Sequence, residues 1–366
     1  MKPVEMIIAG AGDRGFVYAS YAKEHPDRAR IVGVAEPRDF YREKMAQEYN
    51  IPEENVFKDW KDMAKRDKLA DVAIITTQDH MHRDPAVAFA KRGYHILLEK
   101  PMAPDEKSCR DITKAVLGKK IMFAVGHVLR YTRYTRELKA IIDSGRIGDI
   151  ISLQHLEPVG FWHQAHSFVR GNWRNEKESS FMLLTKSCHD LDWIRYIMGK
   201  RCAKVSSFGS LTHFTKKNKP SIAGDNCLEC DYEPDCPYSA KRIYLGFLKR
   251  GNTGWPVSVI AEDVTPVGVV MALREGPYGR CVYECDNDVV DHQVVDMEFE
   301  DGATASFTMT AFTKARQRET RIFGTRGEIY GNGTKIQIYE FLTGKSEIID
   351  TSAEDPVSLA DHGGGD

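Results

Sequence analysis

A glycine-rich turn near the start of the chain is the feature that most constrains its fold. The turn is Gly10-x-Gly12-x-x-Gly15; it follows an apolar run at 4–9 and precedes a helical pattern at 16–24. A second apolar run, 31–35, ends at Glu36. The dinucleotide-binding pattern consists of a strand, a glycine turn, a helix and a second strand that ends on an acidic residue. The sequence therefore predicts a Rossmann-type, doubly wound parallel sheet at the N-terminus.

The residues of this turn have distinct expected roles in binding a dinucleotide. Gly10 permits the tight turn, Gly12 lets the backbone approach the pyrophosphate, and Gly15 lets the helix pack closely on the strand. The phosphates are expected at the helix N-terminus, beside Asp13 and Arg14, where backbone N–H groups and the helix dipole favour an anion.

Two residues at the end of the second strand bear on the choice between NAD and NADP. Glu36 is expected to accept hydrogen bonds from the ribose hydroxyls and to repel a 2′-phosphate, which favours NAD. Arg38 leaves NADP as an alternative cofactor, because a guanidinium can pair with that phosphate.

Strands and helices continue to alternate after Glu36. The pattern predicts strands at 71–76, 95–98 and 121–125, and helices at 42–49, 59–68, 85–92 and 105–117. This alternation implies parallel strands joined by right-handed crossovers, and the ligands of such sheets bind beyond the carboxyl ends of the strands. The polar residues that follow these strand ends are candidate site residues: Thr76, Thr77, Glu99, Lys100 and His127.

Two histidines follow Thr77 in the same loop. His80 and His82 are candidate cofactor-side residues, or residues that support the cofactor contacts from behind. The alternative is that they are polar groups at the start of the next helix.

Composition narrows the class of protein. With 366 residues, 42% of them hydrophobic, the chain is long enough for two globular domains. A formal net charge of −2 gives no reason to expect nucleic acid or an acidic membrane as a partner. No run approaches the roughly 20 apolar residues of a membrane helix, and no signal peptide is visible. Eight cysteines without a secretion signal predict a cytoplasmic protein with reduced thiols or metal ligands.

Five segments form an ordered pattern over nearly the whole chain. They are the turn at 10–15, Glu99-Lys100-Pro101, and the segments 141–150, 188–193 and 323–329. Together they resemble the glucose–fructose oxidoreductase, inositol dehydrogenase and rhizopine-catabolism (Gfo/Idh/MocA) family. The resemblance implies a Rossmann domain at 1–127 and a C-terminal α/β domain at 128–366 with an open, mainly antiparallel sheet. It also implies NAD(P)-dependent oxidation or reduction of a sugar or polyol, and a homo-oligomer, a dimer or tetramer, formed through that sheet.

The resemblance also implies catalytic residues. The Lys of the family's Glu-Lys-Pro motif maps onto Lys100, and its downstream His maps onto His189. Family members often carry Asp four residues before this His, where the present chain has Thr185. A threonine cannot act as a carboxylate base, so the expected proton relay is incomplete. Lys186 is adjacent, but on a regular helix it points elsewhere.

The second domain is expected to supply substrate contacts. Helices are predicted at 132–144 and 183–198, a strand at 150–155, and hairpins at 294–310 and 336–349. An aromatic- and His-rich stretch, 161–174, is predicted as a loop that binds a sugar, or else as a structural loop pinned by its tryptophans. The candidate substrate-binding residues are Lys100, His127, Arg130, Trp162, His163, His166, Trp173, Arg174, Thr185, Lys186 and His189.

An insertion around 212–288 carries a cysteine cluster. Cys227, Cys230 and Cys236 precede a helical pattern at 238–249. The first spacing suits two thiolates that hold one Zn²⁺, and the third cysteine follows nearby. A structural zinc is one interpretation, a loop with free thiols is another, and a redox role is a third. The fourth ligand stays open among four candidates: His213, Cys202, Cys281 and Cys285.

Three functions remain open from the sequence. The leading hypothesis is hydride transfer between a nicotinamide and a sugar or polyol, with Lys100 and His189 handling the proton. The second is a glycosidase that keeps NAD bound and oxidises the sugar only transiently. The third is a catalytically silent NAD-binding regulator, which Thr185 would permit. The chain stops at 362–366, where family members usually carry a further helix, so a truncated chain lacking some site residues is one expectation.

Overall fold

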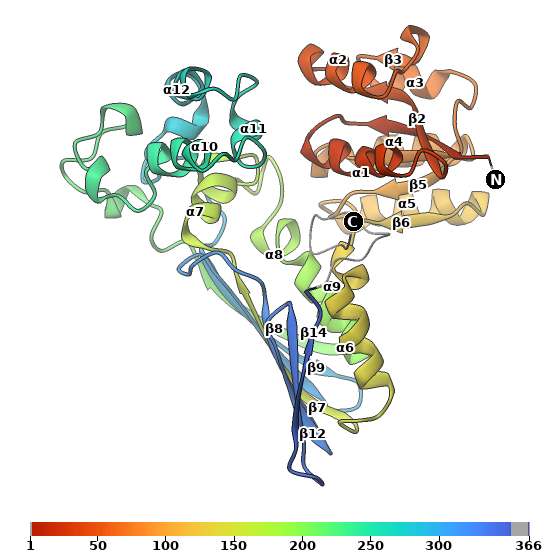
Figure 1. Ribbon diagram of the computed structural model, residues 1–366, viewed down its shortest axis with the longest axis vertical. Helices are drawn as coiled ribbons and strands as arrows, with labels where there is room; N and C mark the ends of the chain where they lie inside the picture. The colour runs from red at the N-terminus through yellow and green to blue at the C-terminus, as the bar shows by residue number, and fades with distance from the viewer. Residues whose placement is uncertain (1, 353–364, 366) are drawn as a thin grey trace. The chain divides into compact units, whose positions relative to one another are not determined.

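The computed structural model describes residues 2–352 and 365, so the segment 362–366 lies outside the described residues except for Gly365. The chain divides between Val128 and Leu129 into two compact units (Figure 1). The first unit contains a six-stranded sheet and the second an eight-stranded sheet.

The N-terminal sheet has the strand order β3-β2-β1-β4-β5-β6, and its neighbouring strands pair in parallel. The strands are β1 Val4–Ala9, β2 Ala29–Ala35, β3 Val56–Phe57, β4 Val72–Ile75, β5 His95–Leu98 and β6 Phe123–Val125. The predicted Rossmann-type sheet is confirmed. The strand order reverses between β1 and β4, and ligands of such folds bind beyond the carboxyl ends of the strands at that point.

Helices cover both faces of this sheet because its strands are apolar on both sides. They are α1 Asp13–Glu24, α2 Asp39–Glu48, α3 Trp60–Lys65, α4 Arg83–Lys91 and α5 Glu106–Lys119. Ile8 belongs to the core that includes Tyr18 of α1 and Met45 of α2, whereas Ile7 belongs to the core that includes Phe89 of α4. Consecutive residues of β1 therefore bury opposite faces of the sheet.

The second sheet has the order β14-β13-β12-β11-β7-β10-β9-β8 and is antiparallel except where β10 pairs with β7. Its strands are β7 Ile150–Pro158, β8 Cys202–Ser210, β9 His292–Phe299, β10 Thr304–Thr310, β11 Glu319–Gly324, β12 Gly327–Gly331, β13 Lys335–Glu340 and β14 Ser346–Asp350. The predicted open, mainly antiparallel sheet is confirmed, and both predicted hairpins are present.

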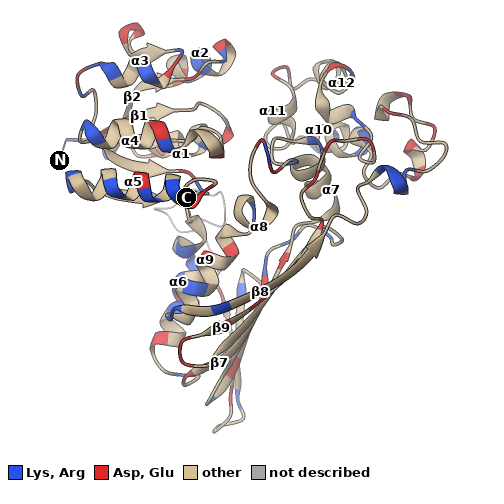
Figure 2. Cartoon of the chain, turned by 180° about the vertical axis from the view of Figure 1, so that it is seen from behind, with Lys and Arg blue, Asp and Glu red and all other residues tan. Residues whose placement is uncertain are grey.

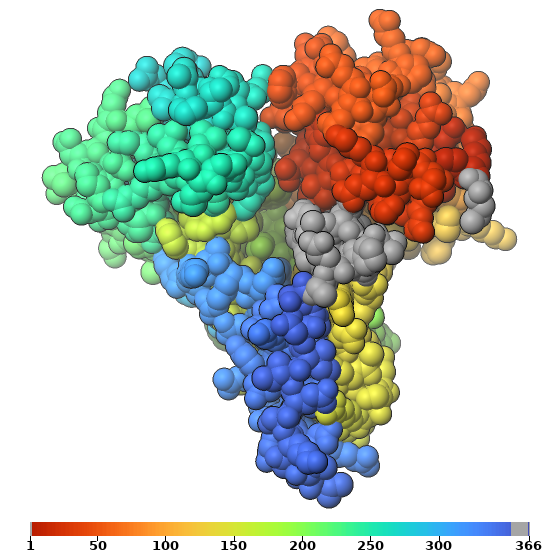
Figure 3. All heavy atoms as spheres, viewed as in Figure 1, coloured from red at the N-terminus to blue at the C-terminus, as the bar shows by residue number. Residues whose placement is uncertain are grey.

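Two helices bury one face of this sheet, and the insertion has a core of its own. α6 Arg133–Asp143 and α9 Cys188–Met198 pack residues such as Leu138 and Trp193 on the inward side of the strands. The insertion contains the π-helical turn η8 Lys241–Leu245 and the helices α10 Gly246–Lys249, α11 Val257–Ile260 and α12 Pro266–Glu275. In Figure 3 its residues, green to cyan, gather into one globule.

Two local predictions are wrong, and one strand was missed. The stretch predicted as a loop is helical, because α7 Phe161–Gln164 continues into the π-helical turn η4 Ala165–Arg170 and buries Ala165 and Val169 in the core of the insertion. The helix predicted at 183–198 is interrupted between α8 Met182–Thr185 and α9. Strand β8 was not predicted, because its residues are exposed throughout and show no apolar period.

Lys, Arg, Asp and Glu side chains are interspersed along both units in the view of Figure 2. None of the helices in residues 2–352 has the length and apolar character needed to cross a membrane.

Candidate active site

The glycine turn allows helix α1 to start close behind strand β1. Gly10 has a φ of 102°, and a Cβ atom there would lie 2.7 Å from the Thr76 carbonyl group. A Cβ atom on Gly15 would lie 2.3 Å from the Gly10 carbonyl oxygen. The Thr76 hydroxyl donates a hydrogen bond to that same oxygen at 2.5 Å. Positions 10 and 15 therefore require glycine, the first for its backbone angle and both for space.

Replacement of Gly15 by alanine should weaken both the fold and cofactor binding. The added methyl group must displace the Gly10 backbone, and such overpacking costs about 1–3 kcal/mol of unfolding free energy. Gly118 is the matched control, because it also lies in a helix, α5, and a Cβ atom there would meet no atom of residues 2–352 within 4 Å. Gly118→Ala should stabilise the fold by about 0.5–1 kcal/mol. Urea denaturation and NADH titration test the pair, and equal stability of the two variants would contradict this packing.

The N-terminus of α1 suits a dinucleotide pyrophosphate. Gly12 is the N-cap residue and supplies no side-chain acceptor to the first helical turn, which begins with Asp13 and Arg14. Among the described residues, a Cβ atom on Gly12 would meet only the Arg38 guanidinium within 4 Å, at 3.6 Å. The Thr77 hydroxyl oxygen after β4 is buried and has no hydrogen-bond partner among the described residues. An uncapped helix N-terminus, an uncrowded glycine and an orphaned hydroxyl fit a bound phosphate group.

Glu36 and Arg38 form an ion pair at the carboxyl end of β2. The Glu36 carboxylate is 3% exposed and accepts hydrogen bonds from the Ala11 N–H at 2.9 Å and the Arg38 Nε–H at 2.7 Å. Burial by itself raises the pKa of Glu36, but the hydrogen bonds from Arg38 and Ala11 outweigh burial, so the pKa is lowered. The acidic residue predicted from the sequence thus lies directly against the glycine turn.

The segment after β5 ties Glu99 to helix α1. Glu99 accepts a hydrogen bond from the Tyr18 hydroxyl at 2.8 Å and pairs with Arg14 at 3.2 Å. Burial, and then the Glu99 charge, raise the pKa of Tyr18, so this phenol keeps its proton. Gly126, after β6, leaves room for the pair, because a Cβ atom there would lie 2.4 Å from the Glu99 carboxylate. Glu99 therefore fixes the backbone immediately before Lys100.

His82 fixes the backbone immediately after Lys100. Its ring is fully buried, with one nitrogen 2.8 Å from the Pro101 carbonyl oxygen and the other 3.0 Å from the Thr77 carbonyl oxygen. His82 thus joins the loops that follow β4 and β5, and its role behind the cofactor contacts stays a prediction. His80 is exposed. Lys100 is half-buried between the two fixed neighbours.

The predicted site residues of the first unit come together at one edge of the sheet. Thr76 and Thr77 follow β4, Lys100 follows β5, and His127 follows β6, and these three strands are adjacent. Parallel strands place their carboxyl ends at the same edge, as the sequence-based argument required.

In the second unit, a buried ion network lies where strand β7 meets helix α9. Asp190 is fully buried and lies 3.1 Å from His155 Nε2 and 2.5 Å from Arg318 Nε. Arg318 also pairs with Glu157 at 2.8 Å, and Glu157 pairs with Lys186 at 3.3 Å. Burial by itself raises the pKa of Asp190, but Arg318 and His155 outweigh burial, so the pKa lies well below its usual range.

Sequence reasoning missed His155, Glu157 and Arg318. A signal existed for the first two, because Leu153, His155 and Glu157 alternate on the buried side of β7. A titratable side chain at a buried strand position must be paired, since an unpaired buried charge is costly. Arg318 precedes β11 in an irregular segment and gives no such signal.

Two predicted substrate residues are engaged by carboxylates of the same unit. Arg130 Nε donates to Asp192 of α9 at 2.6 Å. Arg174 donates to Asp286 through Nε and Nη2, both at 2.9 Å. Trp173 packs against Phe168, with ring centroids 6.3 Å apart. These contacts give all three residues structural roles, and their binding of substrate stays a prediction.

The helix at 161–170 directs aromatic side chains into the insertion. The Trp162 and Phe247 ring centroids are 4.9 Å apart. His166 is 2% exposed, and its Nδ1 lies 2.9 Å from the Tyr244 hydroxyl. Burial, and then the charge of Arg170, lower the pKa of His166 to about 3, so the ring is neutral near pH 7. His166 is a core residue, which corrects its predicted place in a sugar-binding loop.

The predicted residues around His189 lie at the break between α8 and α9. Thr185 is buried at the end of α8, and His189 is the second residue of α9 and 6% exposed. Lys186 lies within the break, so its ammonium group reaches Glu157, whereas a regular helix would direct it elsewhere. Burial, and then the charge of Lys186, lower the pKa of His163 well below its usual value.

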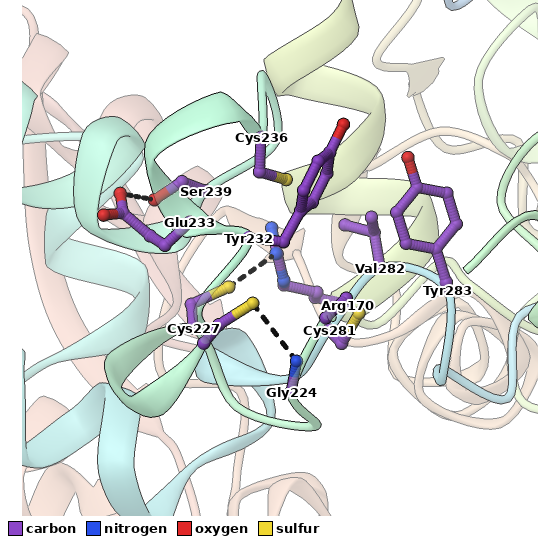
Figure 4. A pocket seen from close by; sticks show the side chains of 12 residues that line it. Arg170, Gly224, Cys227, Tyr232, Glu233, Cys236, Ser239, Cys281, Val282 and Tyr283 are labelled. Carbon is purple, nitrogen blue, oxygen red and sulfur yellow. Dashed lines mark hydrogen bonds between the residues drawn. The ribbon is translucent and has the colours of Figure 1, made fainter. Parts of the chain in front are cut away.

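The three cysteines of the predicted zinc site line one small cavity (Figure 4). Within residues 2–352, no three His, Cys, Asp or Glu side chains are already arranged as metal ligands. The sulfurs take part in separate contacts: Cys227 Sγ faces Arg170 Nη2 at 3.4 Å, and Cys230 Sγ accepts from the Gly224 N–H at 3.3 Å. The structural zinc that Cys227, Cys230 and Cys236 suggested is therefore not supported by the described residues, and the alternative of a loop with free thiols agrees with them.

Comparisons with known proteins agree with both folds. A family model described as "Oxidoreductase family, NAD-binding Rossmann fold" matches residues 4–127, and one described as "Oxidoreductase family, C-terminal alpha/beta domain" matches residues 139–355. A solved structure of levoglucosan dehydrogenase in complex with NADH and levoglucosan has a TM-score of 0.67 at 21% identity. The alignment covers 95% of this chain and 80% of that chain, which shows the fold.

The alignments with curated relatives cover a smaller part of each chain. The 2,7-anhydro-N-acetylneuraminate hydratase of Escherichia coli (strain K12) is 28% identical over 207 residues, 56% of this chain and 53% of the relative. The levoglucosan dehydrogenase of Pseudarthrobacter phenanthrenivorans is 30% identical over 149 residues, 40% of this chain and 37% of the relative. The chain thus spans about half the length of the first of these relatives and less of the second. Because the two family models together cover most of the chain, and both sheets have the matching architecture, the chain belongs to the Gfo/Idh/MocA family of oxidoreductases.

Proposed function

We propose that the protein is an NAD-dependent dehydrogenase that transfers a hydride between nicotinamide and a hydroxyl or carbonyl group of a sugar or polyol. The observation that carries this proposal is the fixed segment around Lys100, on the sheet edge that also bears the glycine turn. A polar group held on both sides is suited to proton transfer at a defined position. The inositol and levoglucosan dehydrogenases among the relatives support the substrate class.

The chain's own residues bind the cofactor and handle one proton. NAD, when bound, supplies the hydride chemistry. The N-terminus of α1 holds the pyrophosphate and Glu36 the adenosine ribose. Lys100 exchanges a proton with the substrate oxygen, and Glu99 positions Lys100 through its contacts with α1. We assign substrate binding to the second unit and a second proton-handling role to His189.

A turnover screen tests this function. The full-length chain is incubated with NAD or NADP and, separately, with polyols, aldoses, uronates and glycosides, while nicotinamide fluorescence is followed. A dehydrogenase gives steady NADH formation with one class of free sugar or polyol. Tight NADH binding without turnover across all four classes would contradict the proposal and favour an NAD-binding regulator.

Cofactor preference gives a separate prediction. Because the Glu36 carboxylate lies against the glycine turn, NADH should bind more tightly than NADPH, which carries a 2′-phosphate. Glu36→Gln should weaken NADH binding about 10- to 150-fold, since hydrogen bonds to a charged group contribute about 1.5–3 kcal/mol. It should also narrow the preference for NADH over NADPH. Glu43→Gln, an exposed carboxylate on α2, is the control. NADPH binding as tightly as NADH to the unchanged protein would argue against an NAD enzyme.

A second candidate function has no net redox change. The Escherichia coli relative is named a hydratase, and adding water to a substrate oxidises nothing overall. In this version the same residues oxidise the substrate transiently and reduce it again, so NADH does not accumulate. Conversion of a glycoside or anhydro-sugar without added NAD, followed by mass spectrometry, distinguishes it from the dehydrogenase.

We also propose that the protein forms a homo-oligomer through the open sheet. The sheet carries exposed apolar side chains on six of its strands: Ile151 on β7, Val205 and Phe208 on β8, Val294 on β9, Tyr330 on β12, Tyr339 on β13 and Ile348 on β14. An exposed apolar patch of this kind marks an interaction surface. Native mass spectrometry should show dimers or tetramers, and a monomer at micromolar concentration would contradict the proposal. The cytoplasmic location stays a prediction.

A further inference from the structure

We propose that Cys227 and Cys230 form a redox-active dithiol, which a low-molecular-weight disulfide of the glutathione type oxidises to a reversible disulfide bond. The buried guanidinium of Arg170 stabilises the thiolate of Cys227 during this exchange. The pair lies in the insertion of the second unit and involves none of the residues assigned to hydride transfer, so the proposal does not depend on the dehydrogenase activity.

The first observation is that the local backbone places the two cysteines one turn apart. Cys227 is the first residue of the short 3-10 helix η6 Cys227–Glu229, and Cys230 is its C-cap residue. The Asn226 side chain accepts a hydrogen bond from the Leu228 N–H at 2.9 Å, which fixes the start of this turn. Residues three apart in a tight turn have Cα atoms within about 7 Å of each other, and a disulfide needs about 4.4–6.8 Å. Both cysteines line the same cavity, so a disulfide between them fits this turn.

The second observation is a buried cation beside Cys227. Arg170 is 1% exposed, and a guanidinium stays charged in proteins. Its Nε donates to the Arg280 carbonyl oxygen at 2.7 Å, and its Nη2 donates to the Tyr238 carbonyl oxygen at 3.0 Å. Its Nη1 is buried and has no hydrogen-bond partner among the described residues. Within this part of the chain, the guanidinium thus bonds to neutral carbonyl groups and to the Cys227 sulfur, and lacks a counter-charge.

A thiolate at Cys227 supplies the missing negative charge. Arg170 Nη2 faces Cys227 Sγ at 3.4 Å, as the dashed line in Figure 4 shows. Burying an unpaired charge is costly, and a positive charge beside a thiol favours the thiolate, which is the form that reacts in thiol–disulfide exchange. The second sulfur has a donor of its own, because the Gly224 N–H donates to Cys230 Sγ at 3.3 Å. Both sulfurs of the pair therefore face groups that stabilise negative charge.

The other two cysteines of the cavity differ from this pair. Burial raises the pKa of Cys236 and that of Cys281, so both thiols keep their protons at neutral pH. Both belong to the buried core of the insertion, where a thiol packs as a small apolar side chain. We therefore assign Cys236 and Cys281 to packing and the redox role to the cysteine pair of the turn.

The proposed oxidation consists of two consecutive exchanges. Cys230 is half-buried and Cys227 is 6% exposed, so Cys230 meets the external disulfide first. The Cys230 thiolate attacks one sulfur of that disulfide, which forms a mixed disulfide and releases one thiolate. The Cys227 thiolate then attacks Cys230 Sγ, which forms the Cys227–Cys230 bond and releases the second thiolate. The pair loses two electrons and two protons, and the external disulfide becomes two thiols.

Peptide mapping of the full-length chain tests the proposal. The folded protein is incubated with excess oxidised glutathione, quenched with acid, blocked with N-ethylmaleimide and digested with trypsin and a glutamyl endopeptidase. Glu229 separates Cys227 from Cys230, and Glu233 separates Cys230 from Cys236, so cleavage gives peptides with one cysteine each. The Cys227 and Cys230 peptides should be joined by a disulfide, and dithiothreitol added before blocking should restore two free thiols. Unjoined peptides, or a disulfide between any other pair of cysteines, would overturn the proposal.

Serine variants separate the roles of the two sulfurs. Cys227→Ser should stop at the mixed disulfide, with glutathione retained on Cys230. Cys285→Ser is the matched control, because Cys285 belongs to the same insertion and does not line the cavity. This control should form the Cys227–Cys230 disulfide at the rate of the unchanged protein. Cys227→Ser without glutathione on Cys230 would overturn the assignment of Cys230 as the thiol that is attacked first.

A substitution of Arg170 tests the stabilising charge. Arg170→Met keeps a long side chain but removes the charge, so it should slow formation of the disulfide about tenfold or more. Arg170→Lys should restore the rate to within a few-fold of the unchanged protein. An unchanged rate in Arg170→Met would overturn the role of Arg170. If both variants fail to fold, a time course with the unchanged protein gives the answer, because a thiolate at Cys227 should convert the mixed disulfide as fast as it forms. Accumulation of glutathione on Cys230 in the unchanged protein would then overturn the stabilised thiolate.

Discussion

Lys100→Ala should lower kcat/KM by about 10²- to 10⁴-fold, the range that a positioned proton-transfer group contributes. NADH binding should be nearly unchanged, because the glycine turn and Glu36 are separate from the Lys100 side chain. The neighbours of Lys100 are fixed by Tyr18 and His82, so the substitution leaves the local backbone in place. The measurement combines the rate of NADH formation with the substrate found by screening and the NADH dissociation constant from fluorescence titration.

Lys107 provides the matched control for this variant. It lies on α5 and is exposed, so Lys107→Ala removes the same charge from the same unit at a site without a proposed role. Its kcat/KM should equal that of the unchanged protein. Turnover by Lys100→Ala within a few-fold of this control would remove Lys100 from the mechanism.

Asp190→Asn should destabilise the protein by about 3 kcal/mol, near the lower end of the cost of breaking a buried ion pair. The carboxylate is fully buried between His155 and Arg318. Without its charge, Glu157 is the one remaining carboxylate paired with Arg318 in this network. Glu298→Gln is the control, because Glu298 pairs with Lys204 at an exposed position and should contribute at most about 1 kcal/mol. Urea denaturation at pH 7 measures both. An equal decrease in unfolding free energy in the two variants would show that burial does not strengthen the ion network.

The Asp190 contribution should also depend on pH. Its pKa is lowered in the folded state, so its stabilisation is fully present above the unfolded-state pKa of about 3.9 and is lost as the pH falls toward the folded-state pKa. The difference in unfolding free energy between the unchanged protein and Asp190→Asn should therefore be constant from about pH 7 to pH 5 and shrink below about pH 4. A difference that grows on acidification would reverse the assigned sign.

The first unit could be predicted from the sequence because its determinants are local. The turn from Gly10 to Gly15, the apolar runs around it and Glu36 lie within a short stretch, and each restricts backbone angle, packing or charge by itself. Strand alternation then places Thr76 and Lys100 at one edge of the sheet, since parallel strands end there together. The hairpins around Gly302 and Gly344 were predictable for the same reason, with two strands and their turn adjacent in the chain.

Tertiary structure alone decided which polar side chains of the second unit meet. Arg318 reaches Asp190, and Cys281 reaches the cavity of Cys227, through segments far apart in sequence that the sheet and the insertion bring together. The helix that replaced the predicted loop at 161–170 has the same origin, because its aromatic residues are buried by a core that forms from the distant insertion. Periodicity and motif spacing report the local backbone, whereas pairing of buried charges and thiols depends on long-range packing, to which no local pattern corresponds.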